Sequence, residues 1–241
     1  MSTRRIVAAL VRHGDYHQPD QVPSAQLPHP LTERGVEQAT ALGQALRDQC
    51  DALGLTLDPV IDCSTLLRAS QTASLAAGVL HRLDSAQKFS IAEFPELGER
   101  SVGAGANLTV TAIAQAIEAD PRYPALPDGW KAHPRFRLPL PGAESLMMAG
   151  ARVAAHVEQR AHELRATSGP SVLKIFISHG GALRHAAVCM GALALDEVPG
   201  LSMHHCGHVL IEHVPDADGG PGRWQKVGGA WKIRPATKAA D

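Results

Sequence analysis

Two histidines with catalytic potential each stand between an apolar run and a glycine. His13 follows Arg12 and precedes Gly14, and His179 precedes Gly180. An imidazole can act as a nucleophile or carry a proton, and a glycine lets the backbone approach a ligand closely. Taken singly, each histidine has an ordinary structural explanation, as a solvent-facing or backbone-bonded side chain. The repetition of the pattern is what indicates chemistry.

An arginine follows the end of a third apolar run. Arg68 lies four residues after Ser64, where an apolar run gives way to a predicted helix. The first N–H groups of a helix attract anions, and a guanidinium adds a planar fork that matches a phosphate. An isolated arginine near a helix start is more commonly a surface residue. Together with Arg12 and the two histidines, however, Arg68 indicates a site for a phosphate-like anion.

These motifs follow strands of a predicted sheet. Residues 6–11 and 172–177 are largely aliphatic and β-branched, which is typical of strands buried on both faces. Strands and helices alternate along the chain, and this predicts an α/β fold, a three-layer α/β/α sandwich with a mostly parallel central sheet. Such sheets bind ligands at the carboxyl ends of their strands. All three motifs fall at that edge.

Hydrophobic periodicity predicts the remaining elements. Strands are expected over 60–63, 88–92, 209–214 and 224–233, and helices over 32–50, 66–80, 109–119, 143–167 and 182–191. Thr32 is expected to cap the helix that follows it. The proline-rich segment of about 94–143 is predicted as a lid-like insertion. We expect a single domain over 1–241 that ends in a frayed segment from Pro235.

Composition excludes several classes of protein. The chain has 241 residues, with 23 Lys and Arg against 24 Asp and Glu, a formal net charge of −1, and 4% aromatic residues. This balance gives no bulk electrostatic reason to bind nucleic acid or an anionic membrane. The scarcity of aromatic residues also argues against base stacking. A site for an anion must therefore be built locally from a few placed cations.

We expect the protein in the cytoplasm. Its four cysteines, Cys50, Cys63, Cys189 and Cys206, form no CxxC pair and suit reduced thiols. The apolar run 6–11 is too short for the core of a signal peptide. No segment reaches the length of a transmembrane helix.

Four motifs give the chain its resemblance to a known family. They are LVRHG (10–14), LTERGVEQA (31–39), STLLRASQTA (64–73) and ISHGGALR (177–184). In order and spacing they resemble the histidine phosphatase superfamily, also called phosphoglycerate-mutase-like, over nearly the whole chain and closer to its phosphatase branch. The resemblance implies a phosphoglycerate-mutase-like fold and a reaction that needs no metal or other cofactor.

The resemblance also implies roles for individual residues. The set comprises a nucleophile, a second catalytic histidine and four phosphate-binding residues: His13, His179, Arg12, Arg68, Gly14 and Gly180. Fixed donors suit this chemistry because they stabilise the charge that is redistributed over the phosphoryl oxygens in the transition state. Two arginines also disfavour the protonated form of His13, which keeps a lone pair available for in-line attack. Water would then hydrolyse the phosphohistidine.

A proton donor for the leaving oxygen is also implied. The segment from Leu97 to Glu99 resembles the family's acid-bearing segment, so Glu99 is expected to act first as the acid and later as the base that activates water. It should sit in a partly desolvated part of the lid. Glu96 is the rival and Glu93 a third candidate. The pair Glu99-Arg100 resembles the mutases of the family.

The chain departs from the family pattern in two places. Pro19 stands where many relatives carry an asparagine that contacts phosphate, and the adjacent arginine pair of the mutases' lid has no clear counterpart. Arg135 and Arg137 are candidates for binding a second anionic group, or are simply solvated. Glu144 and Ser145 resemble the family's G-x-E-S helix start and are expected to cap a helix.

A histidine-rich segment, 204–208, is a candidate of another kind. Strand alternation would place His204, Cys206 and His208 on one face and His205 on the other. These are zinc-binding residue types, but the segment has no second ligand cluster at a typical spacing. We therefore expect no metal, and predict a strand that enters the edge of the pocket with one histidine near the substrate.

The predicted function is metal-independent hydrolysis of a phosphate monoester through a phosphohistidine on His13. The substrate would be a phosphorylated small molecule or a phosphoprotein, and the protein could form a homo-oligomer as its relatives do. A phosphomutase is the alternative enzyme, and it would need a closed lid that excludes water. A catalytically weak binding or scaffold protein is the third reading, although a binding module has no need of the nucleophile.

Overall fold

The computed structural model describes residues 4–23, 26–215 and 222–235. Its strands are β1 (Ile6–Arg12), β2 (Thr56–Leu57), β3 (Val60–Ser64), β4 (Ser90–Phe94), β5 (Val172–Ser178), β6 (Leu201–Ser202), β7 (His208–Val214), β8 (Arg223–Gly229) and β9 (Lys232–Ile233). Its helices are α1 (Glu33–Ala52), α2 (Leu67–Leu83), α3 (Val110–Glu118), α4 (Leu146–Ala166) and α5 (Gly180–Cys189). Three short 3-10 turns are η1 (Pro95–Leu97), η2 (Gly103–Gly105) and η3 (Val198–Gly200).

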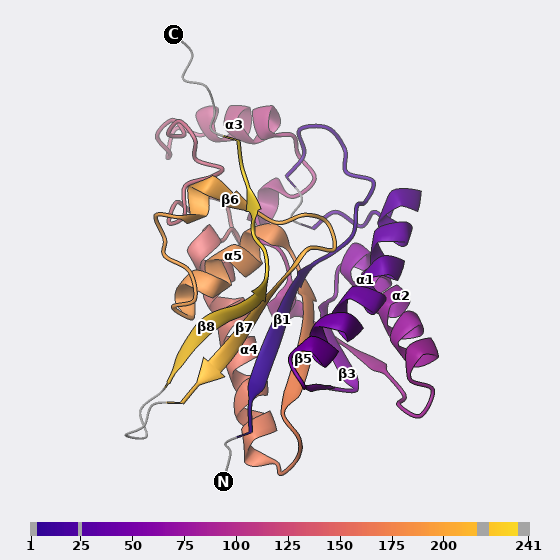
Figure 1. Cartoon of the computed structure of the whole chain (residues 1–241). Helices are drawn as coiled ribbons and strands as arrows, with labels where there is room; N and C mark the ends of the chain where they lie inside the picture. Colours follow the sequence, from indigo (N-terminus) through magenta and orange to yellow (C-terminus); the bar gives the residue numbers. More distant parts are fainter. Residues whose placement is uncertain (1–3, 24–25, 216–221, 236–241) are drawn as a thin grey trace.

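A seven-stranded sheet forms the centre of the fold, in the order β4-β3-β5-β1-β7-β8 with β2 paired to β5 (Figure 1). The pairs among β1 to β5 are parallel, whereas β7 and β8 join antiparallel at one edge. β6 and β9 make a separate two-stranded sheet. The predicted α/β fold with a mostly parallel central sheet is confirmed.

Helices cover both faces of this sheet (Figure 1). Alternate residues of β1 belong to different apolar clusters: Leu10 packs with α4 and α5, whereas Val11 packs with α1 and α2. The two-residue period of a strand sends neighbouring side chains to opposite faces. A strand that is buried on both faces must therefore be apolar throughout, and this is why residues 6–11 contain no polar position.

Register brings the ends of three strands to one level. Arg12 of β1 pairs with Ser178 of β5, and Cys63 of β3 pairs with Ile177. The residues that follow these strands therefore emerge side by side at the carboxyl edge of the sheet. Helices α2 and α5 both begin there.

Helix caps follow the sequence in two of three cases. Thr32 caps α1 by accepting the N–H of Gly35, and Ser145 caps α4 by accepting the N–H of Met148. Glu144 does not cap, which corrects the prediction for that residue. Its carboxylate instead accepts the N–H of Ser101 and pairs with Arg152.

Two predicted strands are wrong. The segment 204–208 is a turn up to Gly207, and β7 begins only at His208, because Cys206 takes a positive φ of 56°. The strand predicted over 224–233 is divided into β8 and β9, and Gly229 has a positive φ of 64° at the division. A left-handed residue interrupts the extended conformation that a strand needs.

The segment 94–143 holds η1, η2 and α3 around an apolar cluster of its own that includes Ile113, Ile117 and Trp130. Among the described residues, no helix is long and apolar enough to cross a bilayer. The frayed end predicted from Pro235 falls almost wholly on 236–241, outside the described residues. The single domain over 1–241 stays a prediction.

Candidate active site

His13 lies directly beyond β1 and is only 2% exposed. Its Nδ1 lies 2.7 Å from the carbonyl oxygen of Gly14. A carbonyl only accepts hydrogen bonds, so Nδ1 carries the proton and Nε2 has a lone pair. Burial, followed by the charges of Arg68 and Arg12, holds the pKa of His13 well below its ordinary value. The imidazole is therefore neutral, with Nε2 as its nucleophilic atom.

Arg68 and His179 stand next to this nucleophile. The Nε of Arg68 donates to Nε2 of His13 over 3.2 Å, and its Nη2 lies 3.1 Å from Nδ1 of His179. His179 Nε2 lies 2.9 Å from the hydroxyl oxygen of Ser64, and the two imidazole centroids are 4.9 Å apart. Burial, then the charge of Arg68, holds the pKa of His179 well below its ordinary value. The sequence predicted this convergence, although it did not foresee Ser64 as a partner.

The Arg68 guanidinium is held in place despite complete burial. Its Nη1 donates to the carbonyl oxygen of Leu27 over 3.0 Å, and its guanidinium carbon lies 4.6 Å from the ring centroid of Tyr16. Tyr16 also makes an edge contact with His13, at a centroid distance of 5.2 Å. Sequence reasoning missed Tyr16, which stands three residues after His13.

Gly14 serves packing more than ligand approach. Its N–H donates to the hydroxyl of Thr72 over 3.0 Å. A Cβ on Gly14 would lie 2.8 Å from the carbonyl oxygen of Gly35, at the start of α1. Since real Cβ atoms do not approach that closely, glycine is needed where the loop after β1 meets α1.

Arg12 reaches across to the turn that precedes β7. Its Nη1 donates to the carbonyl oxygen of Met203 over 2.8 Å, and its Nη2 lies 2.6 Å from Nε2 of His205. His205 Nδ1 is 3.3 Å from Asp15 Oδ1. Burial, and next the charge of Arg12, lowers the pKa of His205 to about 4. A neutral His205 therefore links Asp15 to Arg12.

The histidine-rich segment thus supports the site through a turn rather than a strand. The N–H of Cys206 donates to the carbonyl oxygen of Arg12 over 3.0 Å. Within the described ranges, no group of three or more His, Cys, Asp or Glu side chains is arranged to hold a metal ion.

Glu99 lies at the site, whereas Glu93 and Glu96, the other candidates for the proton donor, do not. Its Oε1 accepts the N–H of Arg100 over 2.9 Å and the N–H of Ala182, in the first turn of α5, over 3.2 Å. Its Oε2 has no hydrogen-bond partner in the part of the chain that the structure describes. Glu93 and Glu96 are exposed and line no part of the cavity that contains His13.

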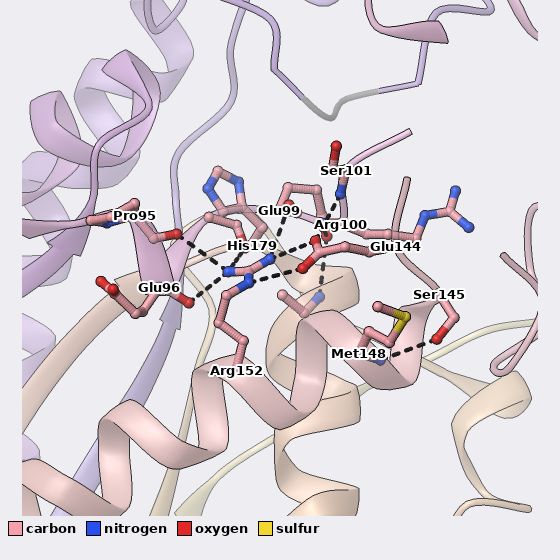
Figure 2. A network of polar contacts seen from close by, with 12 residues as sticks. Pro95, Glu96, Glu99, Arg100, Ser101, Glu144, Ser145, Met148, Arg152 and His179 are labelled. Atoms are coloured by element: carbon pink, nitrogen blue, oxygen red, sulfur yellow. Dashed lines mark hydrogen bonds and ion pairs between the residues drawn. The ribbon is translucent and has the colours of Figure 1, made fainter. Parts of the chain in front are cut away.

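An arginine of α4 holds the turn that carries Glu99 (Figure 2). Arg152 Nη1 donates to the carbonyl oxygens of Glu96 over 2.6 Å and Gly98 over 3.2 Å, and Nη2 lies 3.5 Å from that of Glu99. Its Nε and Nη2 bind both carboxylate oxygens of Glu144, at 3.0 and 2.7 Å. Sequence reasoning missed Arg152, because it is separated from the turn by more than fifty residues.

The site opens into a cavity of about 540 Å³. Its lining includes a cationic set, Arg12, Arg100, Lys131, Arg184 and Arg234, together with Gly180. The one carboxylate in the lining, as far as the described residues go, is that of Glu99. Part of the wall, including Val102 and Pro134, comes from the segment 94–143.

Three positions that the sequence analysis considered for contacts with an anion lie outside the cavity that contains His13. Pro19, Arg135 and Arg137 are exposed and do not line the cavity. Arg100 and Arg184, which the sequence analysis did not select, do line the cavity. Both follow motif residues directly, Arg100 after Glu99 and Arg184 at the end of ISHGGALR, so their positions were readable from the sequence.

Comparison with known proteins shows the family of this chain. Residues 8–219 match the model of the histidine phosphatase superfamily (branch 1). The chain therefore belongs to the histidine phosphatase superfamily.

Individual relatives include both phosphatases and a mutase. Over 185 residues the chain is 30% identical to the mitochondrial serine/threonine-protein phosphatase Pgam5 of Drosophila willistoni, which covers 76% of this chain and 49% of that protein. The chain thus spans about half the length of this curated relative. The mycobacterial glucosyl-3-phosphoglycerate phosphatase superposes with a TM-score of 0.66 at 21% identity, over 95% of this chain and 97% of the other. Phosphoglycerate mutase from Bacillus anthracis superposes with a TM-score of 0.64 at 17% identity, over 93% and 92%.

Proposed function

We propose that the protein is a metal-independent phosphomonoesterase that works through a phosphohistidine on His13. The observation that carries this proposal is the neutral His13, whose Nε2 lies 3.2 Å from the Nε of Arg68 and which lines a cavity together with Arg12 and Glu99. A nucleophile, fixed cations and a carboxylate are the groups that phosphoryl transfer requires.

The reaction follows in two steps. Nε2 of His13 attacks phosphorus, the bond from phosphorus to the ester oxygen breaks, and a protonated Glu99 gives its proton to the departing oxygen through Oε2. Glu99 then takes a proton from water, which attacks the phosphohistidine and releases inorganic phosphate. His13 returns to its neutral form. Arg12 and Arg68 stabilise the phosphoryl oxygens in both transition states.

Hydrolysis is favoured over a mutase reaction by the position of the lid arginines. A mutase must hold the dephosphorylated intermediate in a site that excludes water. Arg135 and Arg137, the candidates for the mutases' arginine pair, are exposed and outside the cavity. The 30% identity to Pgam5, which is named as a phosphatase, supports the same choice.

A small phosphorylated molecule is the substrate that the cavity favours. The volume of the cavity, about 540 Å³, falls in the range of about 300–1,000 Å³ typical of small-molecule pockets. A phosphoprotein, the substrate class named for Pgam5, is the other outcome of a substrate screen. Location in the cytoplasm and assembly into a homo-oligomer stay predictions.

The test is hydrolysis of 4-nitrophenyl phosphate in the presence of EDTA. We expect turnover to survive the chelator and to be abolished in His13→Ala. His17→Ala, an exposed histidine four residues away, is the matched control and should keep full activity. Turnover by His13→Ala at the wild-type rate would refute the nucleophile, and loss of activity in EDTA would refute metal independence. Binding of phosphate esters with no turnover of any would instead support a scaffold protein.

A further inference from the structure

Arg12 is a cation of the proposed site that is held without a carboxylate partner. Its Nη1 donates to the carbonyl oxygen of Met203 over 2.8 Å, and its Nη2 donates to Nε2 of His205 over 2.6 Å. It takes part in no ion pair of the described residues. Its Nε is buried and makes no hydrogen bond in the part of the chain that the structure describes, so this donor remains for a ligand in the cavity that Arg12 lines.

The bond from Arg12 sets the tautomer of His205. A guanidinium carries donors only, so Nε2 of His205 must accept, and Nδ1 carries the proton of the neutral ring. This protonated Nδ1 lies 3.3 Å from Oδ1 of Asp15. The ring is neutral because burial, and next the charge of Arg12, lowers the pKa of His205 to about 4. His205 therefore offers Arg12 an acceptor that has no negative charge.

Asp15 is itself fixed to the start of α1. Its Oδ2 accepts the hydroxyl of Thr32 over 2.9 Å, and its backbone N–H donates to Oε1 of Gln38 over 2.9 Å. Its carbonyl oxygen accepts the N–H of Thr32 over 3.1 Å. Three bonds thus tie Asp15 to the cap and the first turns of α1. A carboxylate held in this way can keep an imidazole in one tautomer and one orientation.

The turn that carries His205 is also bonded to the backbone of Arg12. The N–H of Cys206 donates to the carbonyl oxygen of Arg12, and the N–H of Arg12 donates to the carbonyl oxygen of Gly207, both over 3.0 Å. Cys206 takes its positive φ of 56° in this turn. Such a conformation costs free energy in a residue other than glycine, and it persists where surrounding contacts impose it. Backbone bonds as well as the side-chain bond therefore fix His205 relative to Arg12.

His205 can influence the reaction only through a neighbour. Its ring centroid lies 5.8 Å from that of His13, but His205 does not line the cavity. Arg12 does line it, and Arg12 is the residue that His205 contacts at hydrogen-bond distance. Any effect of His205 on a bound ligand therefore passes through the guanidinium of Arg12.

We propose that His205, held by Asp15, is a positioning residue that orients the guanidinium of Arg12 toward the phosphoryl group without neutralising its charge. A carboxylate at this position would also orient Arg12, but it would form an ion pair and weaken the attraction of Arg12 for a negatively charged phosphoryl group. A neutral imidazole avoids this loss. The inference rests on the proposed function, since Arg12 binds the phosphoryl group there.

Substitutions at position 205 distinguish orientation from charge. His205→Gln keeps a neutral acceptor, the isosteric His205→Glu supplies an acceptor with a negative charge, and His205→Leu supplies none. We expect kcat/KM for 4-nitrophenyl phosphate to stay within about 3-fold of wild type in His205→Gln. In the other two variants it should fall about 10–100-fold, which is the range expected for a lost bond to a charged group or a displaced catalytic group.

The same three substitutions at His204 are the matched controls. His204 is the exposed neighbour of His205 and does not line the cavity. In about 0.15 M salt, which screens exposed charges, His204→Gln, His204→Glu and His204→Leu should all stay within about 3-fold of wild type. A loss in His205→Glu that His204→Glu does not share is then an effect of pairing with Arg12 rather than of added charge.

A double substitution shows whether His205 acts through Arg12. In an Arg12→Met background, His205→Leu should lower kcat/KM by less than about a further 3-fold, because the group that it positions is already absent. The dissociation constant of inorganic phosphate, measured by calorimetry, should rise about 10-fold or more in His205→Glu and His205→Leu and stay near wild type in His205→Gln. Melting curves identify the folded variants, and if His205→Leu does not fold, the comparison of His205→Gln with His205→Glu decides.

Failure of this inference can be told apart from failure of the proposed function. Equal kcat/KM in folded His205→Gln and His205→Glu would overturn the positioning role and leave the proposed function intact. A loss in His205→Leu that is equally large in the Arg12→Met background would do the same. Wild-type protein that does not hydrolyse 4-nitrophenyl phosphate would refute the proposed function. Phosphate binding would then decide the role of His205, and wild-type protein that binds no phosphate would overturn it.

Discussion

Replacing Arg152 by methionine should impair Glu99 as the general acid without changing His13, the nucleophile. Arg152 binds backbone carbonyls of the turn that ends at Glu99, and it pairs with Glu144 through two charge-assisted bonds of 3.0 and 2.7 Å (Figure 2). The paired side chains are 25% and 20% exposed. We therefore take the lower end of the range for such bonds, about 1.5 kcal/mol each, and expect a loss of about 3 kcal/mol in the free energy of unfolding.

The effect on catalysis should depend on the leaving group. A displacement of a catalytic group by about 1 Å can cost about 100-fold in rate, and positioned acid catalysis contributes about 10²–10⁴-fold. Alkyl phosphates need a proton on the leaving oxygen, so their kcat/KM should fall about 100-fold in Arg152→Met. 4-Nitrophenyl phosphate releases a stable anion without that proton, and its turnover should fall less than about 10-fold.

The assay is a series of aryl and alkyl phosphates of increasing leaving-group basicity, with log kcat/KM plotted against the pKa of the alcohol. Arg152→Met should give a steeper dependence than wild type, and Arg152→Lys, which keeps a donor for the carbonyls, an intermediate one. Arg160→Met is the matched control because Arg160 is an ion-paired arginine of the same helix whose partners are Asp62 and Glu163. A parallel, leaving-group-independent loss in folded Arg152→Met would refute the positioning role.

Three further predictions follow from burial and charge. Arg68→Met should lower kcat/KM for 4-nitrophenyl phosphate about 10²–10³-fold, the loss expected for one transition-state donor; a loss below about 10-fold would remove Arg68 from the site. The pKa of His205 is lowered to about 4, so the unfolded chain takes up its proton at a higher pH than the native protein does. The contribution of the neutral His205 to the free energy of unfolding is therefore complete above the ordinary pKa of about 6.5, and it is lost as the pH falls toward 4, by about 1.4 kcal/mol per pH unit. The free energy of unfolding in urea should depend less steeply on pH in His205→Gln than in wild type, and equal slopes would contradict the assignment. Asp62 is fully buried between Lys174, Arg160 and His156. The substitution Asp62→Asn should lower the free energy of unfolding by about 3–5 kcal/mol, and a melting temperature equal to that of wild type would contradict this.

Sequence patterns predicted the parts of the molecule that depend on short-range order. The continuous apolar run at 6–11 and the run at 172–177, which only Lys174 interrupts, are typical of strands covered on both faces, and the residues that follow such strands share one edge of the sheet. That reasoning placed His13 and His179 together, and the structure brings their rings to a centroid distance of 4.9 Å. Thr32 and Ser145 were readable as caps because a cap acts within one turn.

The remainder depends on contacts between distant segments. No local pattern links Arg152 to the turn at Glu99, and none indicates that His205 would link Asp15 to Arg12. The strand predicted through the histidine-rich segment failed because Cys206 adopts a left-handed conformation, which non-glycine residues rarely take without tertiary support. In each case a tertiary contact, absent from the local sequence, determines the result.

Trapping the covalent intermediate tests the central claim most directly. Wild-type protein is mixed with a ³²P-labelled phosphate ester, quenched in alkali within the first turnover, digested, and its labelled peptide sequenced. We predict an acid-labile, alkali-stable label on the peptide that contains His13, and no label in His13→Ala. Turnover with a label on another residue, or with none at any quench time, would contradict the phosphohistidine mechanism.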